Sequence, residues 1–173
     1  NESEPTVTLT TSATSIAENA GTSLTLTATL SGATDQNVTV VLGTSGTATE
    51  GTDYTDGSGA VDDITITAGS TTGTVSFTPT DDSVYEGNET ATIAISSVTG
   101  EASESGTQAV TITITENESA PTVTLTTSAT SIAENSGSSL TLTATLSGAT
   151  NADVTVALST SGAATEGTDY TDG

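Results

Sequence analysis

The residues of this chain that could do chemistry are carboxylates gathered in predicted turns. The run TDDSVYEGNET carries four of them within nine residues, from Asp81 to Glu89. Like charges at this spacing repel one another unless a positive charge lies between them. The chain supplies no such charge, because its 173 residues include 22 Asp and Glu but no Lys, Arg or His. The counter-charge must therefore come from outside.

A hard divalent cation fits this requirement. Calcium binds about six to eight oxygen ligands from carboxylates, carbonyls and water, and it tolerates irregular loops. The simpler alternative is that these carboxylates only solubilise the turns of an acidic extracellular or salt-adapted protein. Their clustering favours calcium, because carboxylates that served only as a solvated coat would be scattered over the outward strand faces, where threonine stands instead.

The composition excludes several classes of function. A chain without cationic side chains cannot displace the counterions of a nucleic acid, and it is not attracted to an anionic membrane surface. Without Cys, His or Lys it has no disulfide, no thiolate metal site and no usual nucleophile or base near neutral pH. Two carboxylates could hydrolyse a glycoside, but one Phe and three Tyr offer little surface for stacking a sugar. We therefore expect no enzymatic activity.

The elements that must position these carboxylates are short strands. The segment SLTLTATL alternates leucine or alanine with threonine, which is the pattern of a half-buried strand with threonine on its solvent face. Six further segments repeat this alternation, and Gly, Ser, Asp and Asn separate them. The seven predicted strands lie at residues 6–10, 23–30, 37–42, 64–67, 74–79, 90–96 and 109–115. Seven such strands predict an all-β fold, an immunoglobulin-like antiparallel sandwich.

The chain is organised as a tandem repeat. PTVTLTTSATSIAEN begins at Pro5 and again at Pro121, and residues 1–57 and 117–173 are identical at 48 positions and different at nine. We expect residues 1–118 to form a complete sandwich and residues 119–173 to be the first half of the next one. The natural protein is then expected to be a longer array, whose neighbouring repeats nearly touch because only about six residues link them.

Several short motifs of the sequence resemble those of the Calx-beta domain family. They are SIAENAG, GTATEGTDY, DDSVYEGNET and the final ITITENES, and they cover residues 5–118 and again the half-repeat that follows. The resemblance implies a seven-stranded immunoglobulin-like sandwich that binds calcium in loops at the end where the next domain attaches. Carried over position by position, it implies these metal ligands: Glu18, Asp53, Asp81, Asp82, Glu86, Glu89, Glu116 and Glu118. The sequence departs from the family at Ser83, in place of a third Asp, and in having Glu116 and Glu118 for the usual terminal Asp residues.

Strand order favours the same set of residues independently. In a sandwich, the first, third and fifth turns can gather at one end, where the last strand also finishes. Asp62 and Asp63 precede a strand and are expected to lie elsewhere. Tyr54 and Tyr85 flank the site and are interpreted as packing residues rather than ligands.

Tandem Calx-beta-like units of this composition resemble the extender regions of large bacterial RTX-type surface adhesins. The hypothesis is a secreted, cell-surface structural repeat, in which Ca²⁺ at the junction between repeats stiffens a rod that projects an adhesive tip. One alternative is a calcium-sensing regulatory module, although near-identical copies argue against it. Another is a ligand-binding or ice-binding surface made by the threonine rows.

The half-repeat lacks the strands that would cover its apolar face. We expect the following side chains to be exposed unless something else covers them: Val123, Leu125, Leu140, Leu142, Leu146, Val154 and Val156. An open sheet edge invites pairing, so a homodimer or an exchange of strands with another chain is expected. The half-repeat's own acidic residues, Glu134 and Asp169, would lack the partners that residues 81–89 supply in the complete repeat.

Overall fold

Strands account for all of the regular structure in the described part of the chain. The computed structural model describes residues 3–56 and 61–171, and these ranges contain fourteen strands and no helix. They therefore hold no helix long and apolar enough to cross a membrane. The chain divides into two compact units, residues 1–118 (unit 1) and residues 119–173 (unit 2).

Unit 1 contains all seven strands predicted from the alternation of leucine, valine and isoleucine with threonine. They are β1 (Thr6–Thr11), β3 (Leu24–Leu30), β4 (Val38–Gly46), β6 (Ile64–Ile66), β7 (Thr72–Pro79), β9 (Glu89–Thr99) and β11 (Ala109–Thr115). Four short strands that the alternation does not show are added to them. These are β2 (Ser15–Ala17), β5 (Tyr54–Thr55), β8 (Val84–Tyr85) and β10 (Ser103–Glu104).

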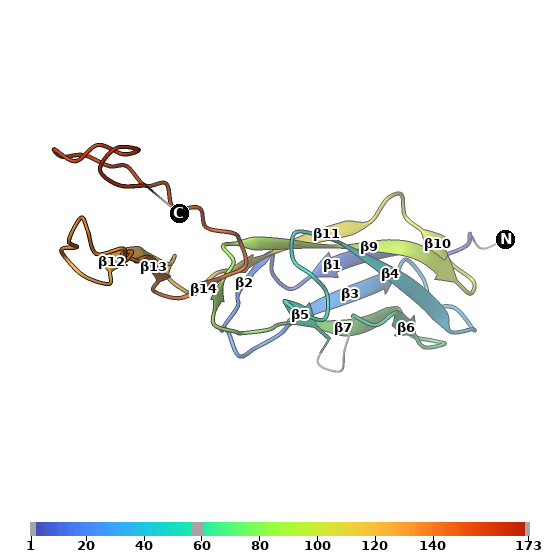
Figure 1. Ribbon diagram of the computed structural model, residues 1–173. Helices are drawn as coiled ribbons and strands as arrows, with labels where there is room; N and C mark the ends of the chain where they lie inside the picture. The colour runs from blue at the N-terminus through green and yellow to red at the C-terminus, as the bar shows by residue number, and fades with distance from the viewer. Residues whose placement is uncertain (1–2, 57–60, 172–173) are drawn as a thin grey trace. The chain divides into compact units, whose positions relative to one another are not determined.

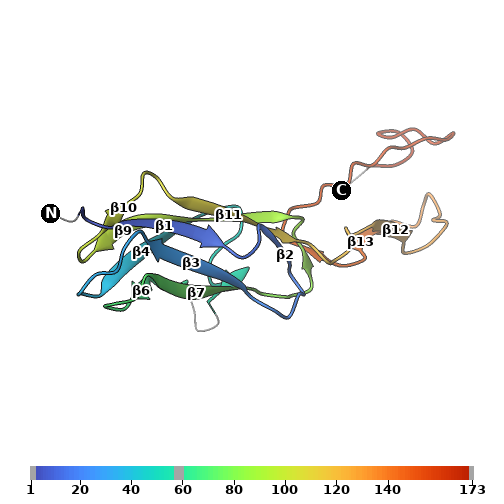
Figure 2. The same cartoon turned by 180° about the vertical axis from the view of Figure 1, so that it is seen from behind.

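Two five-stranded sheets face each other in unit 1 and make the predicted β-sandwich (Figures 1 and 2). The first sheet has the order β10-β1-β3-β7-β5, and the second has the order β2-β11-β9-β4-β6. The long neighbours pair antiparallel, whereas β2 runs parallel to β11 and β10 runs parallel to β1. The fold class predicted from the sequence is thus confirmed.

The core lies between the inner faces of the two sheets. In β3 the apolar residues are buried and the threonines face outward, as the period of two requires. The rings of Tyr54 and Phe77 stack with their centroids 4.6 Å apart, and both side chains are almost fully buried. Tyr54 is therefore a core residue, as the packing interpretation predicted. The other large, fully buried side chains are Leu26, Ile64, Ile66, Ile93, Ile112, Val7, Val38 and Val40.

A close approach of β4 to β9 depends on Gly46. This glycine has a φ of 128°, and a Cβ there would lie 2.1 Å from the carbonyl oxygen of Thr90. Only glycine fits such a position, because any side chain would collide with backbone. The contact holds the end of β4 against the start of β9, where Glu89 lies.

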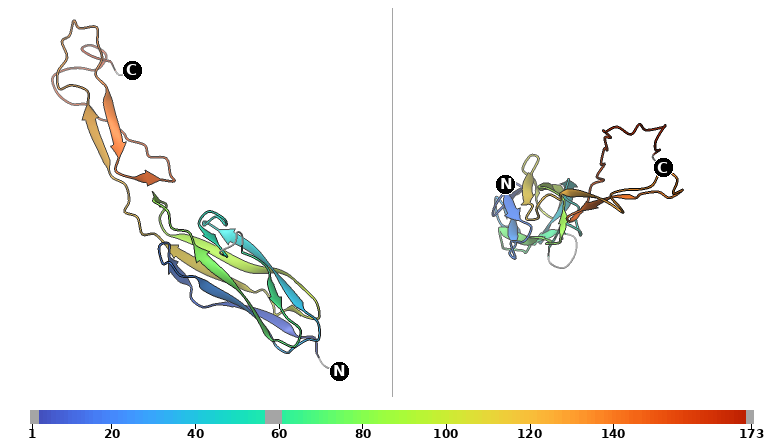
Figure 3. Two further views of the ribbon diagram at one scale, coloured as in Figure 1. Left: turned by 90° about the horizontal axis from the view of Figure 1, so that it is seen from below. Right: turned by 60° about the vertical axis from the view of Figure 1, so that its left-hand side comes forward.

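Unit 2 keeps only part of this architecture. It contains β12 (Val123–Thr127), β13 (Leu142–Leu146) and β14 (Ala149–Thr150) (Figure 3). Strands β12 and β13 pair in the register of β1 and β3, with Val123 opposite Leu146 as Val7 is opposite Leu30. Residues 151–161 form no strand, although the equivalent residues of unit 1 belong mostly to β4.

The apolar side chains predicted to lack cover in unit 2 are indeed exposed. Leu142 is 55% exposed, whereas its equivalent Leu26 is fully buried. The difference arises because, in unit 1, one partner of β3 and both partners of β4 come from residues 61–116, and these have no counterpart within residues 119–173.

Candidate metal centre

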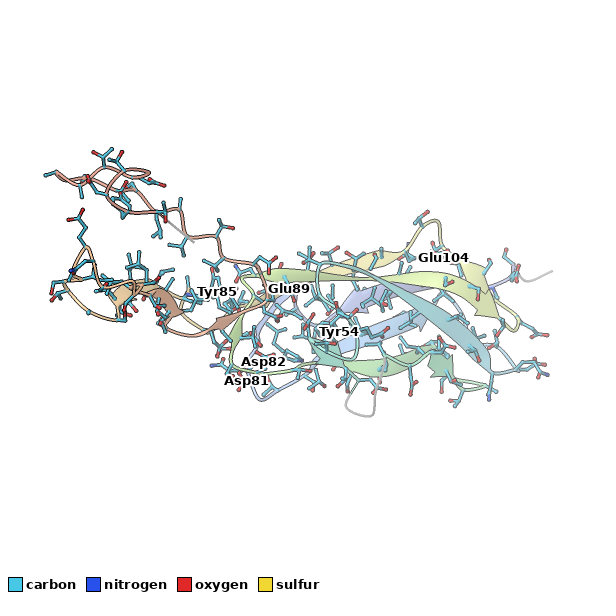
Figure 4. The ribbon with its side chains drawn as sticks, in the orientation of Figure 1. Tyr54, Asp81, Asp82, Tyr85, Glu89 and Glu104 are labelled. Carbon is cyan, nitrogen blue, oxygen red and sulfur yellow. The ribbon has the colours of Figure 1, made fainter. Side chains whose placement is uncertain are left out.

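Four segments of unit 1 bring carboxylates to one end of the sandwich. They are the turn after β2, the loop between β4 and β5, the stretch from β7 to β9, and the end of β11. Figure 4 shows Asp81, Asp82, Tyr85 and Glu89 together at this end, while Glu104 lies at the other. The gathering of turns that strand order predicts is therefore present in the structure.

The parallel pairing of β2 with β11 places Glu18. Ala17 lies opposite Thr115, and the backbone N–H of Glu18 donates to the carbonyl of Thr115 over 3.0 Å. Glu18 is thereby held beside the end of β11 and is only 7% exposed. Its pKa is raised to about 7, chiefly by burial and also by the charges of Glu116, Glu118 and Asp82, while the N–H of Asp82, which donates to its carboxylate, acts to lower the pKa.

Glu116 is the best satisfied carboxylate of the group. One of its oxygens accepts the N–H groups of Glu86 and Gly87 over 2.6 and 2.8 Å. The other accepts the N–H groups of Asn117 and Glu118, both over 2.9 Å. Burial acts to raise its pKa, but these hydrogen bonds outweigh burial and lower the pKa to about 2. Glu116 is thus a fixed negative charge.

Glu118 holds an oxygen that lacks a partner. Its Oε1 accepts the side-chain N–H of Asn117 over 2.8 Å, whereas its buried Oε2 finds no donor among the described residues. The neighbouring Glu116 carboxylate raises the pKa of Glu118, and so do burial and the charge of Asp81. A buried carboxylate oxygen without a donor is costly, and a bound cation would satisfy it.

Asp53 and Glu89 meet on the other side of the group. The backbone of Asp53 is fixed by bonds to Thr49 and Thr80, and its carboxylate accepts the N–H of Thr49. Glu89 is the first residue of β9, not a turn residue. Burial and the adjacent carboxylate of Asp53 raise the pKa of Glu89 to about 7.

The carboxylates form three overlapping groups, within each of which the candidate ligand atoms lie no more than 4.8 Å apart. Glu18 belongs to two of the groups, and so does Glu86, so the three make one continuous acidic cluster. The groups are Glu18 with Asp82 and Glu86, Glu18 with Glu116 and Glu118, and Asp53 with Glu86 and Glu89. Seven of the eight candidate ligands are therefore brought together.

Asp81 is the exception among the candidates, since it enters none of the three groups and only its charge reaches Glu118. Asp62 and Asp63 come just before β6, and Asp63 accepts the N–H of Leu42. Sequence reasoning missed Asn88, whose side-chain oxygen accepts the N–H of Glu116 over 3.0 Å. Its place next to Glu89, in a segment already assigned to the site, was the available signal.

The arrangement suits an oxygen-seeking cation. Seven carboxylates converge without a cationic side chain in the sequence, and backbone N–H groups reach both oxygens of Glu116. Calcium prefers this ligand chemistry, because it accepts many oxygens from loops of irregular geometry.

Fold and site together define an antiparallel β-sandwich domain with an acidic cluster at one end. The chain belongs to the Calx-beta domain family, whose pattern matches residues 1–118 and again residues 116–173. A comparison with curated proteins gave no match.

Two crystal structures show the same fold. One is that of the apo form of the Calx CBD1 domain, which is 19% identical with a TM-score of 0.51, covering 66% of this chain and 99% of that one. The other is that of CBD12 from CALX1.2, which is 20% identical with a TM-score of 0.50, covering 62% of this chain. This chain spans 43% of the length of CBD12 from CALX1.2.

The raised pKa values of Glu18 and Glu89 predict how stability depends on pH when metal is chelated. Both carboxyls have folded-state pKa values of about 7 against an ordinary 4.5, so folding takes up protons between these values. The stability that this proton uptake contributes is complete below pH 4.5 and is lost as the pH rises through 7. Glu116, whose pKa is lowered, does not titrate in that window. Urea unfolding in chelator should therefore show less stability at pH 8 than at pH 5.5.

The double variant Glu18→Gln, Glu89→Gln is the control, since it removes both titrating groups. Its unfolding free energy should change much less between pH 5.5 and pH 8. An equal pH dependence in the variant and in the parent chain would contradict the assignment.

Proposed function

We propose that unit 1 binds calcium through its acidic cluster and acts as an extender repeat of a large secreted adhesin at a cell surface. The observation that carries the calcium proposal is the convergence of seven carboxylates in three overlapping groups, one of which contains Glu118 with its buried, donor-less Oε2. Membership of the Calx-beta family, whose domains bind calcium, supports it. The number of groups favours two or more ions per complete unit.

The cluster has two parts, and each joins different segments of the chain. Glu18, Glu116 and Glu118 join the turn after β2 to the end of β11, and Asp53 and Glu89 join the β4–β5 loop to the start of β9. Glu86 and Asp82 connect these two parts. An ion in either part would hold together segments that are distant in the sequence, so binding should stabilise the sandwich.

The extender role rests on where the cluster lies in the repeat. Glu116 and Glu118 lie at the boundary between the two units, and Pro121 follows within three residues. Ions bound by these residues would restrain the segment that leads to the next repeat. Two near-identical copies in tandem suit a role in which length matters, as in a rod that carries an adhesive tip away from the cell.

Calcium is expected to stabilise unit 1 and magnesium to do so only weakly. Magnesium demands a tight octahedron and gives up its waters reluctantly, whereas this cluster is a loose gathering of loops. With free calcium a hundredfold above the dissociation constant, the gain is about 2.7 kcal/mol per site. Thermal melting in chelator, in millimolar calcium and in millimolar magnesium measures it. Identical curves in calcium and in chelator would rule out the proposal.

Single substitutions should separate coordination from diffuse charge. Glu18→Ala and Asp82→Ala each remove a member of the cluster and should lower calcium affinity by about tenfold or more, since each loss of 1.4 kcal/mol is a factor of ten. Asp62→Ala removes the same charge outside the cluster and should change affinity little. Calorimetric titration of the three variants with calcium decides between coordination and diffuse charge. Equal losses of affinity in all three would show that net charge alone governs binding.

Stiffening of the junction tests the extender role separately from calcium binding. The chain has no cysteine, so Thr25→Cys and Thr124→Cys place one spin label on each unit. Pulsed electron resonance at low concentration should give a narrower distance distribution in calcium than in chelator. In the Glu118→Ala variant, calcium should narrow the distance distribution less. If calcium is shown to bind but the width of the distance distribution does not change, the extender role is refuted and the metal site stands.

A further inference from the structure

The carboxylate of Glu116 is fully occupied by hydrogen bonds from the chain's own backbone. A carboxylate offers about four lone-pair sites, two on each oxygen. Four backbone N–H groups donate to Glu116, two to each oxygen, and they belong to Glu86, Gly87, Asn117 and Glu118. A metal ligand must offer the ion a lone pair. In this arrangement Glu116 has none left to offer.

Glu118, two residues further along the chain, is in the opposite state. Its Oε1 accepts one side-chain N–H from Asn117, and its buried Oε2 has no donor among the described residues. Glu18, the third member of the same group, accepts the N–H of Asp82 over 3.3 Å. Glu18 and Glu118 therefore keep lone pairs for an ion, whereas Glu116 does not.

The loop that donates to Glu116 is shaped for this contact. Gly87 has a φ of 78°, in the left-handed region that other residues rarely adopt. Consecutive N–H groups that converge on one oxygen at such a turn form an anion-binding concavity. The N–H groups of Glu86 and Gly87 converge in this way, and the anion that they hold is the chain's own Glu116.

Asn88 returns the contact. Its side-chain oxygen accepts the backbone N–H of Glu116 over 3.0 Å, so the loop and the end of β11 hold each other through a side chain from each. We call the bonds between Glu116 and residues 86–88 the Glu116 clip. Like the reciprocal bonds of a helix capping box, they fix the backbone on both sides. The clip thereby positions Glu86 on the loop and Glu118 after β11.

We propose that Glu116 is a positioning residue of the calcium site and not a ligand, so that calcium is bound by the other six members of the acidic cluster. They are Glu18, Asp53, Asp82, Glu86, Glu89 and Glu118. This inference rests on the proposed calcium binding and narrows its ligand set. It also departs from the family resemblance, which implies that Glu116 is a ligand. Because the clip consists of hydrogen bonds within the chain, it holds Glu86 and Glu118 in place before calcium binds.

Amide hydrogen exchange of the unmodified chain, followed by NMR, tests the clip directly. The signals of Glu86 and Gly87 are unique, because residues 58–116 occur only once in the sequence. Their N–H groups should exchange at least about tenfold more slowly than in the Glu116→Ala variant, which removes their acceptor. They should exchange no faster in saturating calcium than in chelator, because the ion does not take Glu116 from them.

Two results of this measurement would overturn the proposal. If Glu116 turned to bind the ion, calcium would speed the exchange of both amides toward the rate of the Glu116→Ala variant. If the clip did not form, both amides would exchange rapidly in chelator. Should Glu116→Ala fail to fold, the comparison of calcium with chelator in the unmodified chain decides the matter without it.

Calorimetric titration of the unmodified chain with calcium separates this inference from the proposed function. Calcium binding with slow exchange of both amides supports the positioning role. Calcium binding with release of the two amides overturns the positioning role and leaves the calcium site standing. Absence of calcium binding overturns the proposed function, and this inference falls with it.

Gly87→Ala tests whether the clip contributes to calcium affinity without removing a carboxylate. A Cβ at Gly87 would meet no atom within 4 Å, so the substitution acts only by disfavouring the left-handed backbone. The loop should then leave the clip. Calcium should bind about fivefold more weakly or worse, because binding must restore the loop.

The matched control is Gly69→Ala, which lies between β6 and β7, outside the segments that carry the acidic cluster. Gly69 has a φ of 80°, and a Cβ there would likewise meet no atom within 4 Å. This variant should bear the same backbone strain and bind calcium as the unmodified chain does. Equal losses of affinity in the two variants, or no loss in Gly87→Ala, would overturn the positioning role.

Discussion

Each half of the repeat depends on the other to bury its apolar face. The first half of unit 1 contributes β1, β3 and β4, and residues 61–115 supply the strands that cover them. Unit 2 shows the first half alone. There β12 and β13 keep their pairing, because its hydrogen bonds lie within the half, but the equivalent of β4 loses its strand and Val156 is exposed where Val40 is fully buried. Local alternation predicts where a strand can form, but the strand forms only where a neighbouring strand pairs with it.

The acidic cluster also takes its residues from both halves of unit 1. Glu18 and Asp53 come from the first half, whereas Asp82, Glu86, Glu89, Glu116 and Glu118 come from the second. The carboxylates therefore meet only when the sandwich closes. Closing it buries them and brings like charges together, and burial first and repulsion second raise the pKa values of Glu18 and Glu89. A cation that binds only the closed form offsets this cost and links folding to metal occupancy.

The sequence predicts much of this structure, because its signals are local. Thr alternating with leucine, valine or isoleucine locates the seven long strands, and the acidic residues between the predicted strands locate the seven clustered carboxylates, although Glu89 is the first residue of β9. What it does not show depends on packing at a distance. The parallel pairing of β2 with β11 fixes Glu18, the side chain of Asn88 holds the backbone of Glu116, and neither has a periodic signal. Asp81 is next to a cluster member in sequence, yet it lies outside the groups because neighbouring side chains diverge.

The shortage of positive charge decides how far the protein can organise its own site. Neutral N–H and O–H groups are the only donors that the side chains and backbone can offer, and four backbone N–H groups converge on Glu116 and lower its pKa to about 2. No comparable set reaches Glu118, whose Oε2 is left without a donor in the described structure. Asn117 and Glu118 align with Asn1 and Glu2, so the same residues close one repeat and open the next. The part of the cluster that backbone dipoles leave unsatisfied thus lies in the segment that joins repeats, and this is where an external cation has the most to stabilise.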